Sequence, residues 1–138
     1  MHERGEATDI RILVALEDNY RAYREVIAVG INALRPHTEV TSVGLAELEV
    51  ELARLDPDVV ISSMATRAGS REMLAWVELS LDPDRPSMIR VGGRYSERSN
   101  PGLDVLLKVV DEAEQLIGRE NTQDVASAPS REVLGNEL

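Results

Sequence analysis

Three short apolar runs, separated by segments of helical periodicity, constrain this chain more than any other feature. The runs have the length and branched side chains of buried strands: IRILVAL at 10–16, EVTSV at 39–43 and VVI at 59–61. Between them, apolar side chains recur at helical spacing: Tyr23, Ile27, Ile31, Leu34, then Leu45, Leu48, Leu52 and Leu55. Alternating strands and helices with short connections predict an α/β domain with a mainly parallel sheet.

The middle of the chain leaves two structures open. In residues 70–81, Val77, Leu79 and Leu81 alternate with Trp76 and other non-aliphatic side chains, which favours a strand, but a third crossover helix would also fit. A turn-rich stretch follows, and then SMIRVG provides another short strand. We therefore expect the two strands to pair as an antiparallel hairpin.

A final helix is predicted to start at Asn100-Pro101 and to end at Gly118. Its apolar stripe has helical spacing: Leu103, Leu106, Val110, Ala113 and Ile117. A chain of 138 residues has room for one core, which we place at 10–118. Residues 1–9 are expected to be a flexible lead and 119–138 a disordered tail, since neither has apolar periodicity.

Composition excludes several classes of chemistry. The chain has no cysteine and only two histidines, His2 and His37, so we expect neither a disulfide nor a metal site, and no cofactor motif is present. The formal net charge of −10 repels phosphate backbones, which argues against nucleic-acid binding.

The sequence also predicts a cytoplasmic protein without membrane contact. No apolar run approaches the length needed to cross a bilayer. The first residues, MHERGEATD, are polar and acidic, unlike the basic and then apolar start of a secretory signal.

Two segments resemble the receiver domain of bacterial response regulators. ILVALEDNYRAYREVI at 12–27 resembles its first strand and helix, and PDVVISS at 57–63 resembles the strand that delivers the phosphoacceptor aspartate. The resemblance implies a three-layer, flavodoxin-like fold. It aligns Glu17 and Asp18 loosely with the family's magnesium-binding acidic pair, and it puts Ser63 where the aspartate should be. A serine supplies no metal-binding charge and forms no acyl phosphate, so we predict a degenerate receiver that is not phosphorylated.

Two further positions bear on that resemblance. The family's switch hydroxyl would fall near Val91 or Gly92, which have none. The fragment GLDVLLKVVDE resembles the segment that presents the family's lysine, which would be Lys108, although the same stretch is typical of a solvated helix.

Six polar side chains are candidates for a ligand site at the carboxyl edge of the sheet, where open α/β folds bind ligands. They are Glu17, Asp18, Ser62, Ser63, Arg67 and Arg94. Each also has an ordinary structural interpretation: the acids suit a helix N-terminus, the serines suit loops, and Gly92-Gly93 before Arg94 suits a turn.

Two functions remain open. The first is a non-enzymatic, receiver-like module that signals or scaffolds through protein contacts, as a homodimer whose interface includes Trp76; we expect this tryptophan to be partly exposed because it lies on the polar phase of its strand. The alternative is a small-ligand-binding or enzymatic flavodoxin-like domain that uses the polar carboxyl edge.

Overall fold

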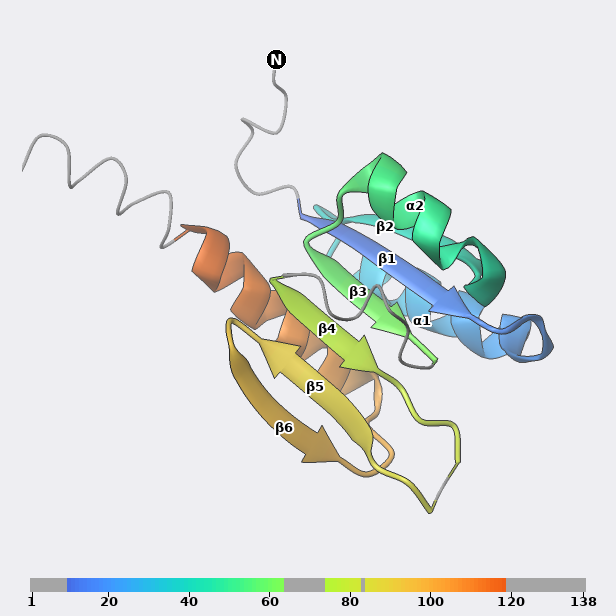
Figure 1. Ribbon diagram of the computed structural model, residues 1–138. Helices are drawn as coiled ribbons and strands as arrows, with labels where there is room; N and C mark the ends of the chain where they lie inside the picture. Colours follow the sequence, from blue (N-terminus) through green and yellow to red (C-terminus); the bar gives the residue numbers. More distant parts are fainter. Residues whose placement is uncertain (1–9, 64–73, 83, 119–138) are drawn as a thin grey trace, which may run out of the picture.

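The computed structural model describes residues 10–63, 74–82 and 84–118 (Figure 1). The predicted lead at 1–9, the predicted tail at 119–138 and Arg67 lie outside these residues.

A six-stranded mixed sheet, ordered β2-β1-β3-β4-β5-β6, forms the centre of the molecule. Its strands are β1 (Arg11–Leu16), β2 (Glu39–Gly44), β3 (Val59–Ser62), β4 (Ala75–Glu78), β5 (Ser87–Val91) and β6 (Arg94–Arg98). The first four are parallel, while β5 is antiparallel to both β4 and β6. The predicted α/β class is confirmed, and so is the antiparallel pairing of the two strands after residue 74.

Helices lie on both faces of this sheet (Figure 1). Helix α1 (Arg21–Leu34) and a C-terminal helix at residues 103–118, orange in Figure 1, pack on one face. Helix α2 (Leu48–Leu55) packs on the other face, over β1 and β3. Short 3-10 turns, η2 (Asp18–Tyr20) and η3 (Leu45–Glu47), precede α1 and α2.

Strand β1 shows why an apolar run of this kind becomes a central strand. Ile12, Val14 and Leu16 join the core beneath α1, while Leu13 and Ala15 join the core beneath α2. A parallel strand covered on both faces needs apolar side chains at every position, because neither phase of its alternation reaches water.

The same reasoning corrects the prediction for Trp76. Its side chain is only 5% exposed and packs on the α2 face against Leu52 and Val60, with the indole Nε1 donating a hydrogen bond of 3.2 Å to Ser62 Oγ. The prediction of a partly exposed tryptophan was wrong because the core beneath α2 extends to β4 and covers the face of the strand on which Trp76 lies.

Strand β6 was missed in the sequence, where its first residues were interpreted as a turn or loop. The turn itself is Gly92-Gly93, and its φ angles of 55° and 90° are those that a two-residue hairpin requires. Glycine at position 92 also lets the hairpin turn approach the C-terminal helix closely, since a Cβ there would lie 2.7 Å from Leu116 Cδ1 of that helix. The strand order begins 2-1-3-4-5, as in a flavodoxin-like sheet, but β5 is antiparallel to β4 and a sixth strand follows it.

None of the helices in the described part of the chain has the length and apolar character needed to cross a membrane.

Candidate functional site

The carboxyl ends of β1 and β2 border an open hollow of about 610 Å³. Strand β1 continues into Glu17 and the turn η2, while β2 continues into η3, so both connections contribute to the lining. The lining residues are Glu17, Asp18, Arg24, Ser42, Val43, Gly44, Leu45, Ala46 and Glu47. The sequence placed a polar site at this edge, and three acidic side chains do line it.

Arg24, in the first turn of α1, is the central charged group of this hollow. Only 7% of the residue is exposed. Its Nη1 donates a hydrogen bond of 3.2 Å to the carbonyl of Leu16 and lies 3.7 Å from Asp18 Oδ1, whereas its buried Nε has no hydrogen-bond partner among the described residues. A buried guanidinium is costly unless a charge compensates it, and the Asp18 carboxylate supplies that charge.

The positions of Glu17 and Asp18 in the sequence suggested that they cap helix α1, but the structure shows a different arrangement. Tyr20 occupies the N-cap position, without a side-chain cap, and Asp18 instead reaches toward Arg24 from the exposed side. Gly44 leaves room for this pair, because a Cβ at that position would lie 2.9 Å from Asp18 Oδ1. The Glu17 side chain makes no cap hydrogen bond either.

The two serines at the end of β3 differ in environment. Ser62 is fully buried, and its hydroxyl accepts the hydrogen bond from Trp76, which is a structural role. Ser63 continues the parallel pairing through its N–H, which donates to the carbonyl of Ala15 at 3.2 Å. The Oγ of Ser63 is buried and has no hydrogen-bond partner in the part of the chain that is described.

Arg94 does not belong to this edge. It is the first residue of β6, which runs parallel to β4, so it lies at the amino end of the sheet. Two residues before it, the Gly92 N–H donates a hydrogen bond to the carbonyl of Leu74, which directly precedes β4. The Arg94 guanidinium lies 3.4 Å from the carboxylate of Glu112. The sequence grouped Arg94 with the carboxyl edge because Arg94 follows a strand, but that strand, β5, is antiparallel to β4 and therefore ends at the amino edge.

The resemblance to receivers also drew attention to possible metal ligands and to Lys108. No group of three histidine, cysteine, aspartate or glutamate side chains within the described ranges could hold a metal ion. Lys108 has an exposed side chain in the middle of the C-terminal helix, the position that its helical interpretation predicted.

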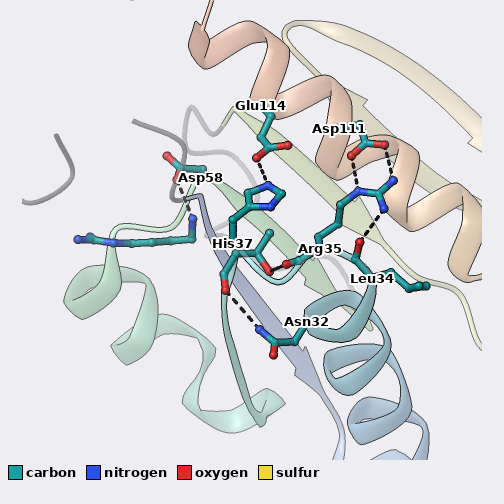
Figure 2. Close-up of polar contacts among 9 residues, drawn as sticks. Asn32, Leu34, Arg35, His37, Asp58, Asp111 and Glu114 are labelled. Atoms are coloured by element: carbon teal, nitrogen blue, oxygen red, sulfur yellow. Dashed lines mark hydrogen bonds and ion pairs between the residues drawn. The ribbon is translucent and has the colours of Figure 1, made fainter. Parts of the chain in front are cut away.

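A second polar cluster, at the amino end of the sheet, was not anticipated (Figure 2). Arg35, directly after α1, forms two hydrogen bonds of 2.7 Å with the carboxylate of Asp111 on the C-terminal helix, and His37 contacts Glu114 one turn further on. These bonds, and the positive charges of Arg35 and His37, lower the pKa of Asp111 below its usual value, against the opposing effect of burial. Partners that are 76 residues apart leave no local signal in a sequence.

Comparison of the chain with protein-family models, with curated proteins and with solved structures found no match.

Proposed function

We propose that this chain is a cytoplasmic, receiver-like module that acts through protein contacts and transfers no phosphoryl group. The observation that carries the proposal is the pairing of Asp18 with the buried Arg24 at the carboxyl edge. The order β2-β1-β3-β4 of the parallel strands, which a flavodoxin-like sheet also has, supports the receiver-like part of the proposal.

The chemistry of this edge argues against phosphoryl transfer. A receiver needs carboxylate oxygens for Mg²⁺, but the positive Arg24 guanidinium lies 3.7 Å from Asp18 Oδ1 and opposes the binding of a cation there. Ser63 follows β3 and offers only an uncharged hydroxyl, which cannot form an acyl phosphate. Ser63 therefore stands where a receiver has the carboxylate that accepts the phosphoryl group.

The distribution of exposed apolar side chains supports a role in protein contact. Of the six large hydrophobic side chains that are exposed in the described part of the chain, four lie on α1. They are Tyr23, Val26, Val29 and Leu34. Exposed apolar groups gathered on one helix are typical of an interaction surface.

The proposal is tested by adding Mg²⁺ with beryllofluoride to the ¹⁵N-labelled chain and recording amide spectra. We expect no saturable shift at Glu17, Asp18 or Ser63, and no mass increase after incubation with acetyl phosphate. Saturable beryllofluoride-dependent shifts, or a stoichiometric gain of one phosphoryl group, would overturn the proposal. In the second case, the Ser63→Ala variant shows whether that hydroxyl is the acceptor.

A small-ligand site in the same hollow is the second candidate function. It is favoured by two buried polar atoms that have no hydrogen-bond partner in the described structure: Arg24 Nε, on a residue that lines the hollow, and Ser63 Oγ, which follows β3 outside the lining. Inorganic phosphate and succinate are suitable anionic probes, because a guanidinium binds both phosphate and carboxylate groups. A saturable rise in melting temperature that is lost in both Arg24→Gln and Ser63→Ala would support this candidate, and its absence with both probes would count against it.

A further inference from the structure

The outer face of α1 carries an apolar stripe that faces away from the sheet. Its members are Ala22, Val26, Val29 and Ala33, all of them exposed, with Val26 and Val29 each 63% exposed. The opposite side of the helix, which includes Ile27 and Ile31, is buried on the sheet. The fold of a single chain therefore does not require this outer face of α1 to be apolar.

The spacing of the stripe is that of a coiled-coil seam, with steps of four, three and four residues. It is also palindromic: Ala, Val, Val, Ala. A two-fold axis between Val26 and Val29 would place Val26 against Val29 of a second copy and Ala22 against its Ala33. A symmetric dimer requires such a self-complementary patch, and a stripe that binds an unrelated partner has no need of this symmetry.

The flanks of the stripe are complementary under the same axis. On the side nearer β2, Glu25 of one copy would face Asn32 of the other, which pairs a carboxylate acceptor with an amide donor. These two residues border an open groove of about 450 Å³ beside the stripe, which leaves room for the contact.

On the other flank, Tyr23 would face Gly30 of the second copy. A Cβ at Gly30 would lie 2.7 Å from Leu103 Cδ2, so the C-terminal helix approaches α1 closely here and offers the tyrosine ring an apolar surface. Tyr23 is 39% exposed and is free to reach it. No like charges would meet along the seam, although the chain carries a net charge of −10.

We infer that the outer face of α1 is a dimerisation surface, on which a second copy of this chain packs its own α1 antiparallel. The inference rests on the proposed protein-contact function and identifies the partner. A helix of 14 residues is about 21 Å long, so the seam belongs to the small class of interfaces, and the dimer forms and dissociates with concentration.

Two matched substitutions test the surface. Val29→Glu places a charge in the seam, whereas Val50→Glu makes the same change on α2, where Val50 is 65% exposed and lies between two glutamates. In sedimentation velocity over a range of concentrations, we expect the unmodified chain and Val50→Glu to approach twice the chain mass at high concentration. Val29→Glu should raise the dissociation constant at least about tenfold.

An unmodified chain that stays monomeric throughout, or equal dimerisation by both variants, would overturn the inference. Circular dichroism melts of both variants establish that the fold is retained. These outcomes are independent of the beryllofluoride experiment, so the inference and the proposed function fail separately.

Cysteine cross-linking tests the orientation, and the native chain has no cysteine to interfere. Antiparallel packing predicts that a mixture of Ala22→Cys and Ala33→Cys chains forms the mixed disulfide under mild oxidation. Ala22→Cys alone should not cross-link, because its two thiols would be about 16 Å apart along the helices. Efficient cross-linking of Ala22→Cys with itself would contradict the antiparallel dimer.

Discussion

Helix α1 and the C-terminal helix pack on the same face of the sheet, yet their outer faces differ. Toward the sheet both are apolar: Ile31 of α1 is fully buried and Leu106 of the C-terminal helix is 1% exposed. Toward solvent, α1 presents Val26 and Val29. The C-terminal helix instead presents polar side chains to solvent, among them Asp104, Lys108 and Gln115.

This difference distinguishes what folding requires of a helix surface from what binding to another molecule requires. The sheet requires only that each helix bury one apolar face, and both satisfy it. A second apolar face, exposed to water, adds nothing to the stability of the isolated domain. Its presence on α1, and its absence from the C-terminal helix, is the observation on which the proposed dimer rests.

The largest effect is expected from the inner faces, where the two helices should behave alike. Leu106→Ala and Ile31→Ala each remove a fully packed side chain and should lower the free energy of unfolding by about 2–5 kcal/mol. Val29→Ala, on the outer face of α1, should cost less than about 0.5 kcal/mol in the monomer. Urea unfolding at low protein concentration measures all three, and a large loss in Val29→Ala would mean that its face is packed within one chain.

The next largest loss of stability is expected where the C-terminal helix contacts the β5–β6 hairpin. Gly92→Ala would have to displace Leu116 as well as strain a positive φ, whereas Gly93→Ala meets nothing within 4 Å. We expect Gly93→Ala to lose about 1 kcal/mol through backbone strain and Gly92→Ala to lose more, about 2–4 kcal/mol. Equal losses in thermal melts would show that the hairpin and the helix are not tightly docked.

The ion pair between the end of α1 and the C-terminal helix should make stability depend on pH. Because Arg35 lowers the pKa of Asp111 in the folded state, the pair stabilises the fold above the ordinary carboxylate pKa, and this stabilisation fades as the pH falls below about 4. Asp111→Asn should therefore lower the urea midpoint at pH 7 and have less effect at pH 3. A loss of the same size at both pH values would assign the effect to packing.

The smallest effect is expected at Lys108, on the polar outer face. Because its side chain is exposed in mid-helix, Lys108→Ala should change the unfolding free energy by less than about 0.5 kcal/mol and leave the sedimentation profile unchanged. A clear change in self-association would move part of the contact surface to the C-terminal helix.

Much of the fold could be read from local patterns. The short β-branched run at 10–16 predicted a strand, and residues Arg11–Leu16 form β1. The helical spacing of Ile27 and Ile31 correctly marked the buried face of α1. The polar carboxyl edge followed from topology, since the ends of parallel strands meet there. The prediction failed where neighbours decide: Trp76 is covered because it belongs to the core beneath α2, and Arg94 lies at the opposite end because β5, which precedes it, runs antiparallel to β4.

The sequence by itself determined the periodicities, the serine that follows β3 and the absence of cysteine, because these depend only on which residues follow one another. Tertiary structure decided which charges meet. Arg24 reaches Asp18 because the turn η2 places the aspartate beside the first turn of α1. Arg35 reaches Asp111, 76 residues away, because α1 and the C-terminal helix pack on the same face of the sheet. Packing also decided that the seam on α1 stays exposed, because a helix with two apolar faces can bury only one of them against its own sheet.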